Sequence, residues 1–114
     1  MEDAVGEARE LALNYLSYKP RTTSEVQRRL EREDYRPAVV EEVIAYLEEH
    51  EYLNDRTYAR LFAEERFAGR GYGPYRVQQD LRKRGISQDT IDWAIGEVFD
   101  PESVRGEARR QAEK

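Results

Sequence analysis

The chain of 114 residues has the length of one domain. Its 24 acidic and 19 basic residues leave a net charge of -5, and its eight tyrosines, three phenylalanines and one tryptophan supply bulky apolar surface that disordered chains lack, so we expect a folded protein. The absence of cysteine excludes disulfides, thiolate metal sites and thiol catalysis, and the single histidine, His50, argues against histidine-based metal or triad chemistry. We therefore expect no metal, no cofactor and no enzymatic activity.

The hydropathy pattern argues against a membrane protein. The sequence contains no apolar run near the roughly 18 residues that span a bilayer. Its first ten residues are acidic, whereas a secretory leader begins with basic residues followed by apolar ones. We expect a soluble, cytoplasmic protein.

An internal repeat organises the chain. A shift of 51 residues, without a gap, places apolar residues of the first half on apolar residues of the second half. The matched positions are 8/59, 11/62, 12/63, 16/67, 26/77, 30/81, 35/86, 40/91, 43/94, 44/95 and 47/98. Such self-similarity indicates one structural unit written twice.

The first copy of the repeat predicts three helices, at residues 3–18, 23–33 and 37–50. Thr22 and Glu25 form a capping-box pair before the second of these helices, and Pro37 suits the first turn of the third. The third helix carries apolar residues at 40, 43, 44 and 47, the spacing of one helical face.

The second copy predicts helices at residues 55–69, 74–84 and 88–99. Asp55 and Ser87 are candidate caps, Pro74 suits a first turn, and Gly85 can end a helix in a left-handed turn. Because no segment alternates with period two over a useful length, we expect no strands.

These elements predict an all-α fold of tandem three-helix repeats that form a short helical solenoid. The predicted boundaries are 1–53 for the first repeat, 54–100 for the second and 101–114 for a C-terminal tail, which we expect to be either a frayed helix or a helix that awaits a partner. The middle helix of each repeat has only two strong apolar anchors, so we expect the two repeats to lean on each other.

Charge is unevenly distributed along the chain. Residues 25–51 carry nine acids and four bases, whereas residues 56–84 carry eight bases and three acids. The basic stretch includes the turn 70–76, where two arginines flank two tyrosines beside a helix start, a chemistry that suits a phosphate or an acidic protein surface. Most single charges are expected to be solvated or paired along a helix, as Arg60 is with Glu64.

Arg66 has two interpretations, because the repeat places it opposite Tyr15 at the edge of the apolar stripe. It is either a snorkelling arginine paired with a local carboxylate or a residue held rigid to present its charge. Tyr72 and Tyr75 are expected mainly to pack or to stabilise turns, and stacking on nucleobases is the lesser alternative.

One long, ordered set of residues resembles the central signature of the RecX family of recombination regulators. The set comprises Tyr52-Leu53-Asn54-Asp55, Tyr58-Ala59, Arg66, Gly71-Tyr72-Gly73-Pro74, Arg76-Val77 and Leu81-Arg82-Lys83-Arg84-Gly85-Ile86. The resemblance implies an all-helical protein of tandem three-helix repeats that binds the RecA filament, lies in its helical groove and modulates ATP hydrolysis and strand exchange. Some members of that family also bind DNA, so the resemblance implies DNA as a further possible partner.

The resulting hypothesis is a monomeric, non-enzymatic modulator of RecA filaments. The predicted contact surface is Arg66, Arg70, Tyr72, Arg76, Arg82, Lys83 and Arg84. Two alternatives stay open. In the first, the chain is a nucleic-acid-binding module for single- or double-stranded DNA, since short helices and tight turns also build helix-turn-helix DNA-binding domains. In the second, it is an adaptor for another protein.

Overall fold

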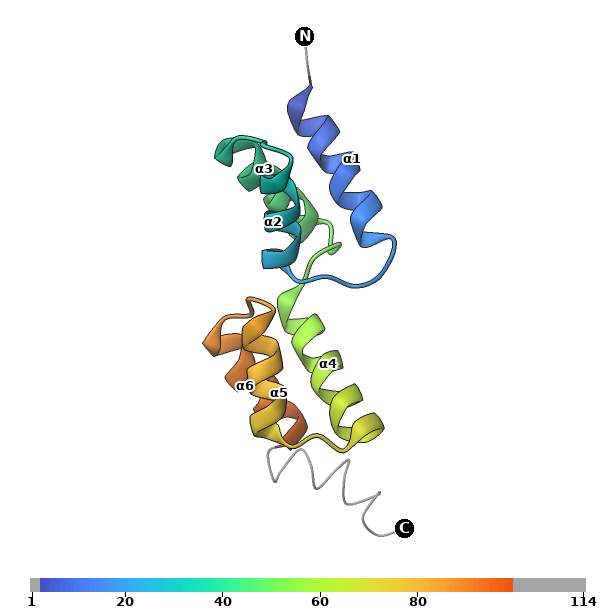
Figure 1. The fold of residues 1–114 in the computed structure, drawn as a ribbon, viewed down its shortest axis with the longest axis vertical. Coiled ribbons are helices and arrows are strands. Elements are labelled where there is room, and N and C mark those ends of the chain that lie inside the picture. The colour runs from blue at the N-terminus through green and yellow to red at the C-terminus, as the bar shows by residue number, and fades with distance from the viewer. Residues whose placement is uncertain (1–2, 100–114) are drawn as a thin grey trace. The chain divides into compact units, whose positions relative to one another are not determined.

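The computed structural model describes residues 3–99, which form six α-helices and no strand (Figure 1). The helices are α1 (Ala4–Leu16), α2 (Thr23–Arg32), α3 (Pro37–Glu49), α4 (Asp55–Arg70), α5 (Pro74–Lys83) and α6 (Gln88–Phe99). The predicted all-α class is confirmed, and each predicted helix overlaps an observed one. The expected tail helix at 101–114 lies outside the described residues.

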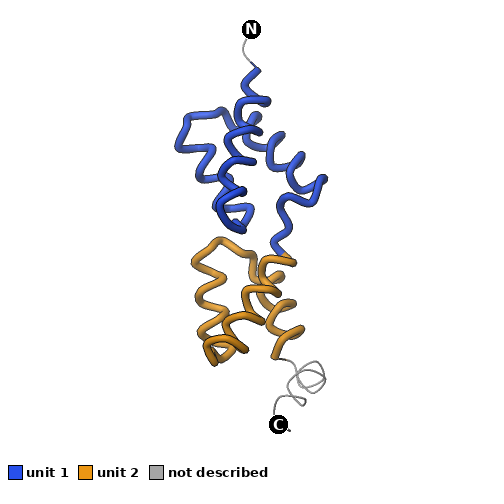
Figure 2. Tube along the Cα trace, turned by 90° about the vertical axis from the view of Figure 1, so that its right-hand side faces the viewer, with its two compact units in different colours: residues 1–55 blue, residues 56–114 orange. Residues whose placement is uncertain are grey.

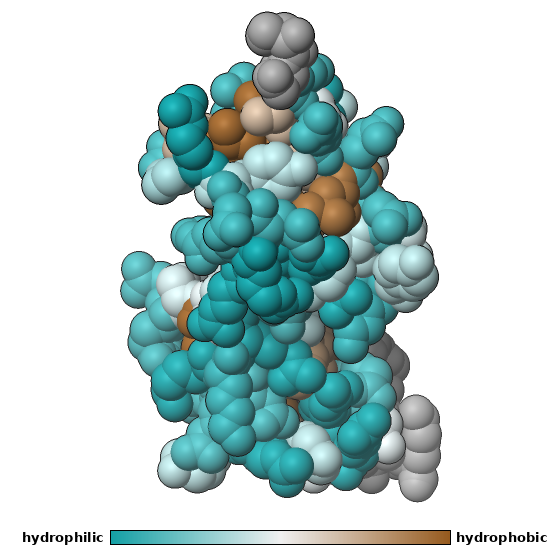
Figure 3. All heavy atoms as spheres, turned by 45° about the horizontal axis from the view of Figure 1, so that its top comes forward, coloured by the Kyte–Doolittle hydropathy of each residue, from teal (hydrophilic) through white to brown (hydrophobic). Residues whose placement is uncertain are grey.

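The chain divides into two compact units, residues 1–55 and 56–114 (Figure 2). Each unit contains three of the helices. No helix within residues 3–99 is both long enough and apolar enough to cross a membrane. On the face shown in Figure 3, hydrophilic residues cover most of the surface and apolar ones emerge in small patches.

The helices of the first unit begin at the signals found in the sequence. The capping box before α2 is confirmed, because Thr22 Oγ1 accepts the Glu25 N–H at 3.1 Å and Glu25 Oε1 accepts the Thr22 N–H at 3.0 Å. Pro37 is the first residue of α3. The helix predicted at 3–18 ends earlier, at Leu16, where the Ser17 hydroxyl donates to the Asn14 carbonyl, three residues before Pro20.

The core of the first unit lies where α1, α2 and α3 pack pairwise. Ala8 and Ala12 are completely buried, and these small side chains let α1 approach the other two helices closely. The buried residues of this core are Ala8, Ala12, Val26, Leu30, Val39, Val40, Val43, Leu47 and Leu53.

The second unit also buries one core among its three helices, and α5 packs against α6. Gly85 ends α5 with φ 84°, as expected, and the Ile86 N–H returns to the Leu81 carbonyl at 3.2 Å. The Ser87 hydroxyl accepts the Thr90 N–H at 3.3 Å at the start of α6. Asp55 is the first residue of α4, and its Oδ1 accepts the backbone N–H of Thr23 at 2.9 Å. The buried core comprises Ala59, Phe62, Ala63, Val77, Leu81, Ile86, Ile91, Ala94 and Val98.

Seven of the nine buried residues of each core occupy matching positions in the repeat. The residue pairs at 8/59, 12/63, 26/77, 30/81, 40/91, 43/94 and 47/98 are buried in both units. The matched alanines and the matched Val and Leu anchors show no exposure at all. The predicted duplication is therefore also a duplication of packing.

Candidate functional site

Side chains of five of the predicted contact residues meet between α4 and α5 in the second unit. We call Arg66, Arg70, Tyr72, Arg76 and Arg84 the α4–α5 arginine cluster. Arg66 and Arg70 lie on the last turns of α4, Tyr72 lies in the connection, Arg76 lies on the first turn of α5, and Arg84 caps the end of α5. The short connection between the two helices brings these side chains together.

One end of the cluster is organised around the ring of Phe62. The guanidinium carbon of Arg66 lies 4.1 Å from the ring centroid, and that of Arg84 lies 4.6 Å from it. Arg84 also donates from Nε to the Tyr58 hydroxyl at 3.0 Å and from Nη1 to the Asp80 carbonyl at 3.4 Å. Arg84 is therefore half-buried and joins α5 to α4.

The other end is organised around Tyr72. The guanidinium of Arg76 lies 4.1 Å from the Tyr72 ring centroid and donates to the Tyr72 hydroxyl at 3.2 Å. A side-chain hydrogen bond with Tyr72, followed by the negative charge of Glu65, raises the pKa of Arg70 above its ordinary value. Arg70, like every arginine, is positively charged at physiological pH.

Two acidic residues connect these ends. Glu65 pairs with Arg66 through Oε1 and lies 4.0 Å from Arg70 Nε through Oε2. Asp80 Oδ2 lies 3.5 Å from Arg76 Nε, and the backbone carbonyl of Asp80 accepts a hydrogen bond from Arg84 Nη1. The contacts thus run in a closed loop, and four guanidinium groups against two carboxylates leave the cluster positive.

The contacts of Arg66 agree with both interpretations. Its side chain is 20% exposed, lies over Phe62 and pairs with Glu65, which is the arrangement of a snorkelling arginine with a local carboxylate partner and also holds the guanidinium in place. Arg60 and Glu64 form the predicted pair on α4, with a distance of 2.9 Å between Nη1 and Oε2.

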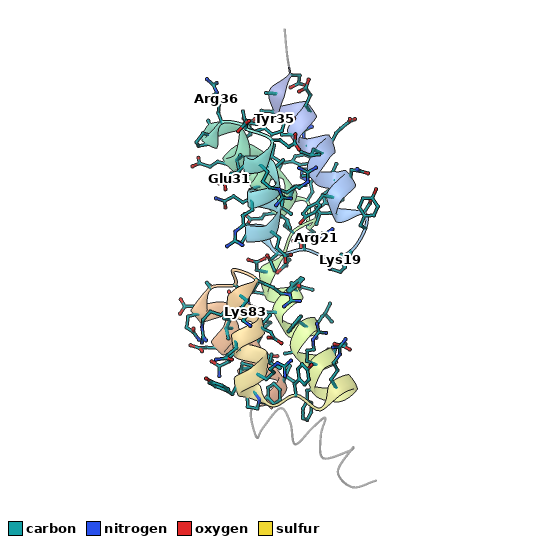
Figure 4. All side chains as sticks on the ribbon, viewed as in Figure 1. Lys19, Arg21, Glu31, Tyr35, Arg36 and Lys83 are labelled. Atoms are coloured by element: carbon teal, nitrogen blue, oxygen red, sulfur yellow. The ribbon has the colours of Figure 1, made fainter. Side chains whose placement is uncertain are left out.

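Arg82 and Lys83 do not join the cluster. Arg82 donates from Nε and Nη2 to Gln88 Oε1 at 3.2 and 3.0 Å, so its guanidinium lies toward α6. Lys83, labelled on α5 in Figure 4, is exposed. Successive helical residues point about 100° apart, and this places Arg82 and Arg84 on different flanks of α5.

The first unit contains two arginines over tyrosine rings that the sequence pattern did not predict. Arg9 lies 4.2 Å from the Tyr46 ring centroid, and Arg21 lies 3.8 Å from that of Tyr15. Figure 4 shows Arg21 beside Lys19 in the connection between α1 and α2. A signal was available, because the repeat matches Tyr15 and Arg21 with Arg66 and Tyr72, exchanging aromatic ring and guanidinium.

The described residues hold no cluster suited to a metal. Within residues 3–99 no group of three or more histidine, cysteine or acidic side chains is placed to bind an ion. His50 is exposed, and its Nδ1 donates to the Tyr46 carbonyl at 2.9 Å at the end of α3. Its contacts are those of a residue at a helix end.

Together, these features define a class: a small all-helical protein of two tandem three-helix units, with charged and aromatic side chains organised on its surface. The family model for the first three-helix domain of RecX matches residues 8–47, and that for the second three-helix domain matches residues 54–95. The chain belongs to the RecX family.

Curated relatives carry the name regulatory protein RecX. The protein of Bacillus subtilis (strain 168) is 37% identical over 103 residues, which cover 90% of this chain and 39% of the relative. That of Lactococcus lactis subsp. cremoris (strain SK11) is 34% identical over 113 residues, covering 98% of this chain and 42% of the relative. The chain therefore spans less than half the length of these relatives.

Solved structures agree with the fold. The crystal structure of RecX from Lactobacillus salivarius superposes with a TM-score of 0.84 at 26% identity, covering 100% of this chain and 79% of that one. A second crystal structure, of a regulatory protein RecX, gives a TM-score of 0.76 at 27% identity and covers 98% of this chain and 59% of that one. Family and fold thus lead to the same assignment.

Proposed function

We propose that the protein is a non-enzymatic regulator that binds the RecA nucleoprotein filament and modulates its ATPase and strand-exchange activity. Membership of the RecX family supports this proposal, because the curated relatives are named as regulatory proteins. The observation that carries it is the α4–α5 arginine cluster, which lies wholly within the matched second RecX domain. The proposed cellular location is the cytoplasm, where the recombinase acts.

The contacts inside the cluster would favour binding in two ways. Guanidinium groups held by rings and carboxylates lose less conformational freedom on binding than free side chains do. Their positive charge would also steer the encounter with an acidic surface of the filament. We place Arg66, Arg70, Tyr72, Arg76 and Arg84 at the centre of the proposed contact surface, and the exposed Arg82 and Lys83 at its margin.

The direct test is the ATPase activity of RecA on single-stranded DNA with this protein titrated in. We expect a change in steady-state ATP hydrolysis that saturates as the protein concentration rises. An unchanged rate at saturating protein would reject the proposal. The readout belongs to RecA, so it requires no catalytic activity of the titrated chain.

The cluster is tested with Arg70→Gln/Arg76→Gln. The two side chains are 55% and 57% exposed, so their replacement should leave the melting temperature unchanged. We expect the half-saturating concentration in the ATPase titration to rise about fivefold or more, since charged anchors often dominate binding energy. The matched control is Arg28→Gln/Arg32→Gln, two exposed arginines of α2 that lose the same charge outside the cluster. Equal weakening by both variants would show that total charge, not the cluster, is responsible.

Direct DNA binding is the second candidate. No side chain caps the first turn of α5, so its backbone N–H groups remain available for a phosphate beside Arg70 and Arg76. Engagement of three or four phosphates predicts a slope of about -3 for the logarithm of affinity against the logarithm of salt concentration on duplex DNA. Titration of labelled DNA without RecA tests this, and absent or salt-independent binding would discard it. Capture of another protein without RecA would instead favour an adaptor.

A further inference from the structure

A groove in the first unit has the opposite chemistry to the arginine cluster. It lies between α2 and α3 and has a volume of about 320 Å³. Its apolar lining comes from Val40, Ile44 and Ala45, and its charged lining comes from Glu31, Glu41 and Glu48. Figure 4 labels Glu31 on α2.

The three carboxylates surround the apolar lining without a cation of their own. All three are exposed, and within residues 3–99 none lies within ion-pair distance of a basic side chain. Glu31 accepts one neutral hydrogen bond, from Gln27 Nε2 at 3.1 Å. The groove therefore combines apolar contact area with uncompensated negative charge, a combination that repels phosphates and attracts cations.

In the second unit, side chains of the chain itself bridge the two helices at the positions that match this groove. The repeat matches Glu31, Pro37 and Glu41 with Arg82, Gln88 and Asp92. Arg82 donates twice to Gln88 Oε1, and Gln88 Nε2 donates to Asp92 Oδ1 at 2.9 Å, so a continuous bridge joins α5 to α6. In the first unit a carboxylate replaces the guanidinium and a proline replaces the amide, so the bridge has lost its cationic and its donating groups.

We propose that this groove binds a basic, amphipathic segment of a partner protein, whose arginine or lysine side chains pair with the three glutamates while its apolar side chains pack on Ile44 and Ala45. Glu41 corresponds to Asp92, which in the second unit accepts a hydrogen bond from the Gln88 amide, and an incoming basic side chain would supply a donor to Glu41. The proposal goes beyond the RecA-binding function and does not depend on the arginine cluster. A nucleic acid is excluded as the occupant by the sign of its charge.

The glutamates also set the spacing of the partner's cations. Glu41 and Glu48 are seven residues apart on α3, which corresponds to two helical turns and about 10 Å along its axis. A helical segment would match them with basic residues seven positions apart. The probe is therefore a fluorescein-labelled synthetic peptide with two arginines at that spacing and leucines on the same face.

The first test compares two pairs of isosteric variants on the same helix. Glu41→Gln/Glu48→Gln removes two groove carboxylates, whereas Glu42→Gln/Glu49→Gln removes two adjacent exposed carboxylates that do not line the groove. By fluorescence anisotropy we expect the first pair to weaken peptide binding about fivefold or more and the second to change it by less than about twofold. Equal weakening by both pairs, or no peptide binding by the unmodified chain, would overturn the proposal.

The second test closes the groove with the chemistry of the other unit. Glu31→Arg/Pro37→Gln reproduces the residues of the Arg82–Gln88–Asp92 bridge opposite the existing Glu41. We expect peptide binding to be lost while circular dichroism and the melting temperature stay those of a folded chain. Undiminished binding by this variant, with the fold intact, would contradict a site between α2 and α3.

Sedimentation equilibrium identifies whether the occupant is a second copy of the chain. Self-association that disappears in Glu41→Gln/Glu48→Gln but persists in Glu42→Gln/Glu49→Gln would show that the groove binds the basic stretch of a second copy of this chain. That result would overturn the proposal of a separate partner protein. A monomer that still binds the peptide supports the proposal. None of these readouts involves RecA, so their failure is distinguishable from failure of the proposed regulatory function.

Discussion

Arg84 illustrates at the scale of single residues that a charged side chain can belong to the packing of a unit. It touches the Phe62 ring, the Tyr58 hydroxyl and the Asp80 carbonyl, which come from both α4 and α5. A variant that removes it changes the joint between these helices as well as the surface charge. Replacement of Arg76, Arg82 and Arg84 together would therefore mix stability with binding.

We predict that Arg84→Ala lowers the free energy of unfolding by about 1–2 kcal/mol, because two hydrogen bonds and the cation–π contact are lost together. The measurement is urea denaturation followed by circular dichroism, with an unchanged m-value showing that the unfolding transition is otherwise the same. Lys83→Ala is the neighbouring control and should stay within about 0.5 kcal/mol of the unmodified chain, since it is an exposed position. A neutral Arg84→Ala would show that the contacts of Arg84 do not stabilise the fold.

At the scale of helices, comparison of the two repeats identifies a strained helix end in the first unit. Asp34 adopts φ 64° after α2, and the matched residue after α5 is Gly85 with φ 84°. This left-handed conformation brings the β-carbon of an L-residue close to its own backbone, whereas glycine adopts it freely. The same turn is thus built once with a suitable residue and once with a less suitable one.

We predict that Asp34→Gly raises the free energy of unfolding by about 0.5–1 kcal/mol, because relief of the left-handed strain exceeds the added flexibility of the unfolded chain. Gly85→Ala should lower it by about 1 kcal/mol for the converse reason. Both changes are read from thermal or urea unfolding. A destabilising Asp34→Gly would mean that the aspartate side chain contributes more at this turn than the strain removes.

Helix starts and core faces could be predicted because their causes are local. The capping box of Thr22 and Glu25 joins residues three positions apart, and the apolar faces of α3 and α6 repeat within two turns. Helix ends were less predictable. The end of α1 at Leu16 depends on the hydrogen bond of Ser17 and on the path of the chain toward Pro20.

At the scale of the whole molecule, the two units combine one fold with opposite charge. Residues 25–51 carry an excess of acids and residues 56–84 an excess of bases, although their buried positions correspond. Duplication thus kept the packing pattern while the surfaces diverged. The chain offers two chemically distinct surfaces, a cationic cluster and an acidic groove, on equivalent scaffolds.

Together with the proposed binding of the RecA filament, this polarity predicts that salt acts mainly on the association step. Raising the ionic strength from low to physiological values shortens the screening length to about 8 Å, which weakens long-range steering more than close contacts. In surface plasmon resonance on immobilised filaments we expect the association rate to fall several-fold and the dissociation rate to change less. A salt effect confined to dissociation would contradict steering by the separated charges.

The sequence by itself determined the duplication, the six helices, seven matched positions of the two cores and the resemblance to the RecX family, because periodicity, caps and turn residues act over a few positions along the chain. Only the tertiary structure decided which charges meet. It separated Arg82 from Arg84 on opposite flanks of α5, placed Arg66 and Arg84 at the same phenylalanine ring, and left the α2–α3 groove open where the other unit is bridged. The reason is that long polar side chains choose partners across packed helices, where small differences in direction select among several carboxylates, amides and rings.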